Sequence, residues 1–182
     1  MSKFAFDINN VHKFFINLQE DYEEYIKEDT SSKKALRVAM GSWHLNHWIY
    51  EEFKELIDSK FENNNNFQSY LRQECKEFSI MQKICNGSKH YVLQRNNDGN
   101  DKIESTELHN GAFSDEFSRG FDISCLKIKL KDGTIIYFED IAKKACAEFV
   151  SIIVENRHNG VSVHNVPEQT IEQQKRRFSI AL

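Results

Sequence analysis

The segment over residues 33–58 carries apolar side chains on nearly every side of the helix that its spacing predicts. A helix that is apolar all round is usually buried at the centre of a protein, with other elements packed against several of its sides. The sequence therefore predicts a mainly helical protein built around this segment. Its apolar residues are Leu36, Val38, Met40, Trp43, Leu45, Trp48, Ile49, Tyr50, Phe53 and Leu56.

Three further segments are expected to form helices that cover the central one. Residues 8–28 repeat apolar side chains every three or four positions. Residues 67–85 predict a third helix, or a broken pair of helices, that stops at Asn86 and Gly87. A last helix is expected at about residues 139–156. Only one proline and seven glycines occur in the 182 residues, so few signals interrupt these helices.

A β-hairpin is predicted at about residues 125–138, just before the last helix. Apolar and basic side chains alternate along its first half, as on a strand with one buried face. Asp132 and Gly133 then supply a turn that is typical of hairpins. The alternating residues are Leu126, Lys127, Ile128, Lys129, Leu130 and Lys131.

These elements define the expected fold class, a mainly α (α+β) protein. We expect a four-helix bundle with a β-hairpin inserted before the last helix. One helical domain is expected over residues 1–160, followed by a polar C-terminal tail over residues 161–182. The asparagine-rich tract over residues 62–66 is expected to be a connector, and the polar stretch over residues 94–122 is expected to be a long loop that is either functional or mobile.

Composition and charge limit the function classes. The net charge is −4, so no general attraction for nucleic acids or anionic membranes is expected, although a local basic patch would still allow RNA binding. The four cysteines are widely spaced, and the N-terminus lacks the apolar core of a signal peptide. The longest apolar run, over residues 149–154, is too short to cross a bilayer. We expect a cytoplasmic protein with reduced thiols, no membrane contact and no cofactor.

His44 and His47 lie three residues apart and therefore share one side of the central helix. Helical bundles bind zinc or iron with such histidines when further ligands come from neighbouring helices. His12 or His90 could supply such a ligand, but the pair alone does not make a site. The favoured alternative is a hydrogen-bonded core histidine at position 44 with His47 at the rim.

A second cluster of polar groups spans Cys85 to His90 and includes Asn86 and Lys89. Functional groups just past a helix end suit a binding or catalytic loop, and a glycine-terminated helix with solvated polar residues is the simpler alternative. If the second and third helices form an antiparallel hairpin, position 81 faces 44 and residues 86–90 lie level with 35–39. The candidate site residues are then Arg37, His44, Asn86, Lys89 and His90, at one end of a groove.

Two other sequence patterns resemble binding sites. The run from Asn96 to Glu107 resembles an EF-hand loop, but Asn96 and Asp101 replace the usual aspartate and turn glycine, so a polar surface loop is the favoured interpretation. The alternating lysines of the hairpin could contact phosphates. They are more typical of an exposed strand face or a protected sheet edge.

Two short motifs carry a resemblance to known families. The run Trp43-His44-Leu45-x-x-Trp48, with the run from Asn86 to His90, resembles a family of small bacterial proteins with AWHLxDW-like and NGSKH-like motifs. The resemblance covers roughly residues 10–155. Ser42 stands here in place of the alanine and His47 in place of the acidic residue. That family implies no particular chemistry.

More distantly, the helical hairpin that ends in Asn-x-x-x-His resembles HEPN-type domains, which occur in defence and toxin systems. Active members usually have an arginine directly before that asparagine. Cys85 stands at this position, which argues against ribonuclease activity. The spacing of Arg37 to His44, and that of Arg157 to His164, also fits the loose R-x4–6-H pattern of these nucleases.

Three functions remain as hypotheses, and the sequence leaves open whether the protein is an enzyme. The first is a cytoplasmic bacterial subunit that binds a protein partner or a second copy, in a defence or toxin–antitoxin type system. The second is a metal-independent ribonuclease that uses Arg37 or Arg157 with His44, His90 or His164. The third is a bundle metalloprotein that uses His44, His47 and another histidine.

Overall fold

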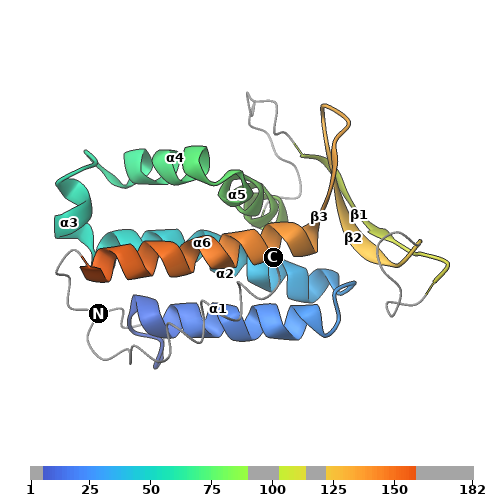
Figure 1. Cartoon of the computed structure of the whole chain (residues 1–182), viewed down its shortest axis with the longest axis horizontal. Coiled ribbons are helices and arrows are strands. Elements are labelled where there is room, and N and C mark those ends of the chain that lie inside the picture. The colour runs from blue at the N-terminus through green and yellow to red at the C-terminus, as the bar shows by residue number, and fades with distance from the viewer. Residues whose placement is uncertain (1–5, 90–102, 114–121, 159–182) are drawn as a thin grey trace.

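A computed structural model of the chain describes residues 6–89, 103–113 and 122–158 (Figure 1). These residues form a helical layer and a small antiparallel sheet, which confirms the expected mainly α, α+β class. The sheet lies at one end of the helices (Figure 1). The helices are α1 (Val11–Ile26), α2 (Ser32–Glu52), α3 (Lys54–Asp58), α4 (Asn64–Glu74), α5 (Lys76–Lys89) and α6 (Phe138–His158), and the strands are β1 (Ile103–His109), β2 (Cys125–Leu130) and β3 (Ile135–Tyr137).

Helix α2 is the central helix, and it packs against α1, α5 and α6. The side chains of Val38, Leu45 and Ile49 are fully buried on it. This helix was expected to be buried on all sides, and only part of its surface is exposed. Leu36 and Met40 keep 37% and 40% of their surface exposed, because they lie on the side of α2 that these packed helices leave uncovered.

Two predicted helical segments are divided by breaks, and the sequence offered a break as an alternative only for residues 67–85. The predicted helix over residues 33–58 is two helices, because Phe53 leaves the helical conformation between α2 and α3. The predicted third helix is the broken pair α4 and α5, with the break at the extended residue Cys75. The asparagine-rich tract over residues 62–66 is more than a connector, because it also caps a helix. Asn63 caps α4 by accepting a hydrogen bond from the Asn66 N–H, at 3.1 Å.

The predicted stop at Asn86 and Gly87 is wrong, because α5 continues through both residues to Lys89. Both lie on the exposed side of the helix, where a glycine costs only about 1 kcal/mol relative to alanine. The Ser88 hydroxyl donates to the Cys85 carbonyl at 2.7 Å and so occupies an acceptor in this last turn. Residues 85–89 of the polar cluster are therefore the end of a helix and not a loop.

The predicted hairpin is confirmed, and it is part of a three-stranded sheet with the order β1-β2-β3. Gly133 adopts a φ of +87° in the turn between β2 and β3, a conformation that favours glycine. The expectation of a loop over residues 94–122 is wrong in part, because β1 lies within this stretch. Its residues are mostly polar and exposed, so it lacks the alternation that identifies a half-buried strand.

The hydrophobic core lies between the helices, where α5 packs on α6 and both face α2. Phe78 of α5 and Phe149 of α6 are fully buried, with ring centroids 4.6 Å apart. The ring of Tyr25 at the end of α1 meets the edge of Phe138 at the start of α6, at 5.1 Å. Ile128 of β2 is buried on the side of the sheet that faces the helices. These contacts fix α5 and α2 relative to each other, and the candidate site lies on those helices.

Candidate functional site

The candidate site is one side of α2 together with the side chains that reach it from α4 and α5. Trp43 and His44 are consecutive on α2, and each lies three or four residues from both Met40 and His47, so these side chains form one continuous part of the helix surface. Arg72 of α4 lies over the Trp43 ring, and Gln82 of α5 reaches Arg72. We call this surface the Trp43 face; it consists of Met40, Trp43, His44, His47, Arg72 and Gln82.

The Arg72 guanidinium is half-buried and held entirely by neutral groups. Its carbon Cζ lies 6.0 Å from the centroid of the Trp43 ring, within the range of a cation–π contact. One terminal nitrogen donates to the Ser69 hydroxyl at 2.8 Å, and the other lies 3.5 Å from the Gln82 side-chain oxygen. Burial lowers the pKa of Arg72, and none of the described carboxylates pairs with it. The positive charge therefore remains uncompensated within the described part of the chain.

His44 lies beside Cys85, with its Nε2 atom 3.9 Å from the thiol sulfur. The expected alignment placed residue 81 opposite His44, so the observed contact with Cys85 lies one helical turn further along α5. Partial burial and the nearby His47 lower the pKa of His44. Burial also raises the pKa of the Cys85 thiol, which disfavours the thiolate that a cysteine nucleophile needs. The pair is a packed contact and lacks the electrostatics of a Cys–His catalytic pair.

His47 lies at the exposed edge of the face, as the favoured alternative predicted, but His44 is also exposed and so is not the core histidine that this alternative expected. The Nδ1 atom of His47 is 3.0 Å from the Asn64 side-chain nitrogen, so the amide can donate to the ring. The described residues contain no group of three or more histidine, cysteine, aspartate or glutamate side chains placed to hold a metal ion. The metalloprotein hypothesis thus has two histidines and no third ligand in this part of the chain.

Arg37 lies on α2 but is held by α1. Its guanidinium pairs with Glu24 and also with Asp21, for which the Nε to Oδ1 distance is 3.2 Å. Both carboxylates raise the pKa of Arg37, and the hydrogen bond to Glu24 has the larger effect. A phosphate would have to displace both partners, so this arginine is not available as a phosphate ligand in the described conformation.

The other candidate residues are only partly brought together. Asn86 and Lys89 are exposed on the last turn of α5, the helix whose Cys85 contacts His44. His90 and His164 lie outside the residues that the structure describes, and Arg157 is described only as part of α6.

The remaining patterns do not add to the site. Of the EF-hand-like run, residues 96–102 lie outside the described residues and 103–107 belong to β1. The lysines of β2 lie on the central strand of the sheet, so they do not protect an edge. Lys129 pairs with Glu104 at 3.0 Å, and Glu107 is the β1 residue opposite Lys127. These carboxylates reduce the attraction of the strand for phosphates.

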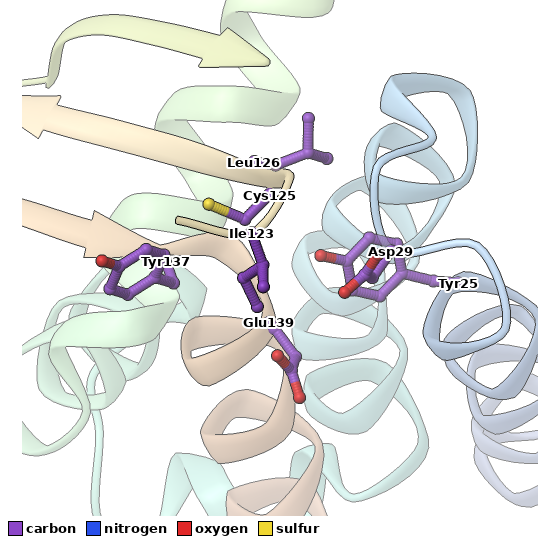
Figure 2. Close-up of a pocket in the computed structure, with 7 residues that line it drawn as sticks. All are labelled: Tyr25, Asp29, Ile123, Cys125, Leu126, Tyr137 and Glu139. Carbon is purple, nitrogen blue, oxygen red and sulfur yellow. The ribbon is translucent and has the colours of Figure 1, made fainter. Parts of the chain in front are cut away.

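A pocket elsewhere in the molecule is too small to compete with this site. It lies where the end of α1, the sheet and the start of α6 meet, and Asp29, Cys125 and Glu139 are among its lining residues (Figure 2). Its cavity volume is about 10 Å³, which is room for about one water molecule. Small-molecule sites usually measure roughly 300–1,000 Å³.

Comparisons with protein-family models, with curated proteins and with solved structures found no match. None of the described helices is both long and apolar enough to cross a membrane. The function must therefore be argued from the Trp43 face itself.

The chemistry of Cys85 can be checked by its rate of alkylation. We expect iodoacetamide at pH 8 to modify the half-buried Cys125 before Cys85, and Cys75 and Cys146 last. Burial raises the pKa of both Cys75 and Cys146 to about 12. Mass spectrometry of digested protein gives the four rates. If Cys85 were modified faster than Cys125, it would be an activated thiol, and a catalytic role with His44 would have to be considered again.

Proposed function

We propose that the protein is a non-catalytic cytoplasmic subunit that binds a partner protein through the Trp43 face. The observation that carries this proposal is the combination of an exposed Met40 with a half-buried Trp43 and the uncompensated Arg72. Tryptophan, arginine and methionine are enriched in protein interfaces, and tryptophan and arginine dominate their binding energy. The surface thus has an apolar part and a cationic part side by side.

The biological setting is proposed from the resemblances. The likeness of the helical hairpin to HEPN-type domains supports a HEPN-like bundle and a role in a bacterial defence or toxin–antitoxin type system. Ribonuclease chemistry is not proposed, because Arg37 is held by two carboxylates and Cys85 stands where active HEPN-type domains usually have arginine.

The proposal is tested by capturing partners from cells with tagged variants. Met40→Asp is expected to reduce the amount of the captured partner at least tenfold, because a charge replaces an apolar contact beside Trp43. Ile135→Asp is the matched control, since Ile135 is 54% exposed on the distant sheet and receives the same change. Equal capture by both variants would show that the partner does not bind at the Trp43 face. Light scattering of the wild-type protein alone shows whether a second copy is the partner.

A further inference from the structure

We propose that the Trp43 face recognises a carboxylate, in an acidic segment of the partner protein, through the Arg72 guanidinium. The proposal rests on the proposed function and adds the chemistry of the partner. Two arginines of the helical layer differ in their partners. Arg37 is held by Asp21 and Glu24, whereas among the described residues Arg72 meets Ser69, Gln82 and Trp43 and pairs with no carboxylate.

Arg72 is prepared to bind a planar anion. A guanidinium has five N–H donors in a rigid fork that matches the two oxygens of a carboxylate. Ser69 and Gln82 accept from one terminal nitrogen each and so fix the side chain in one orientation. The Trp43 ring lies under the cation and stabilises it without neutralising it. An incoming carboxylate would therefore gain a charge-assisted pair with little loss of side-chain entropy on the arginine.

The surroundings of Arg72 favour a peptide over a free anion or a nucleic acid. Met40 lies next to Trp43 on α2 and offers an exposed apolar contact, which suits a segment with both acidic and apolar side chains. RNA binding usually needs several cations along a phosphate backbone, but the chain carries a net charge of −4. Arg37, the arginine of α2, is already paired with Asp21 and Glu24.

The two tryptophans of the chain make a direct experiment possible. Trp43 lies under Arg72, whereas Trp48 packs on the ring of Phe14 of α1 at 5.0 Å. In a titration of ¹⁵N-labelled full-length protein, a synthetic peptide of glutamate and leucine should shift the indole N–H signal of Trp43 and leave that of Trp48 in place. A matched peptide with glutamine in place of glutamate should bind at least about tenfold more weakly, because it lacks the charge. The signals are assigned with Trp43→Phe and Trp48→Phe.

Variants of the two arginines separate specific recognition from general attraction. Arg72→Gln should weaken binding of the glutamate–leucine peptide about tenfold or more, and Arg37→Gln should leave it within about twofold. Arg72→Lys keeps the charge but loses the fork, and it should bind with intermediate affinity. Thermal melts show that each variant is folded before its affinity is compared.

Several results would overturn the inference. One is an equal loss of affinity in Arg72→Gln and Arg37→Gln; another is equal binding of the glutamate and glutamine peptides. A shift of the Trp43 signal by single-stranded oligouridylate, with none by the acidic peptide, would assign the face to RNA. Partner capture separates this inference from the proposed function. Loss of the partner in Met40→Asp but not in Arg72→Gln would keep the docking surface and reject carboxylate recognition.

Discussion

Phe78→Ala is expected to lower the free energy of unfolding by about 3–5 kcal/mol. Phe78 is fully buried on α5, and its ring lies 4.6 Å from that of Phe149 on α6. Alanine is a good helix former, so the loss comes from the missing ring contacts and the cavity and not from the backbone. Urea denaturation followed by circular dichroism measures the change.

The control for this substitution is Leu36→Ala on α2. Leu36 is 37% exposed, so its truncation should change the free energy of unfolding by about 0.5 kcal/mol or less. A loss below about 1 kcal/mol for Phe78→Ala would contradict the packing of α5 on α6. That packing matters for function, because α5 carries Gln82 to Arg72 and Cys85 to His44.

Gly111→Ala is expected to open the end of the sheet and to destabilise the protein by about 1–3 kcal/mol. A Cβ atom at Gly111 would overlap the backbone of Asp122 and Ile123. The chain on either side is held by the Asp122 carboxylate, which lies 2.5 Å from His109 Nε2 and accepts from the Ala112 N–H at 3.2 Å. Separating the two segments would break both contacts.

Hydrogen–deuterium exchange is the measurement for Gly111→Ala, which should speed exchange in β1 more than in α1. Gly133→Ala is the matched control, and it should destabilise the protein for a different reason. Gly133 has a φ of +87° but nothing within 4 Å of an added Cβ, so only the backbone conformation is penalised, by about 1–2 kcal/mol. Unchanged exchange in Gly111→Ala would show that the two segments are not in close contact.

The sequence predicted those elements whose pattern is local. Regular apolar spacing identified the α1 and α6 helices, and alternation with an Asp-Gly turn identified the β2–β3 hairpin. Strand β1 was missed because its stability comes from pairing with β2 and not from an apolar face. The end of α5 was misplaced because Gly87 is a usual stop signal, but here the last turn continues to Lys89.

The candidate site was only half predictable for a related reason. His44 stood out from its neighbours in sequence, whereas Arg72 lies on another helix with no motif around it. The sequence spacing indicated Arg37 as the candidate arginine of the site, because spacing does not reveal that Asp21 and Glu24 of α1 pair with it. The distinguishing feature of Arg72 is the absence of a described carboxylate, and this depends on how α2, α4 and α5 pack together.

The most direct test of a docking surface at the Trp43 face is site-specific photo-crosslinking in the cells that make the protein. A photoreactive amino acid is placed at Met40 in one variant and at Ile135 in another, since both side chains are exposed. We predict a single crosslinked protein species from position 40 and none from position 135, and Arg72→Gln should remove that species. No crosslink at position 40, or the same species from both positions, would contradict the account.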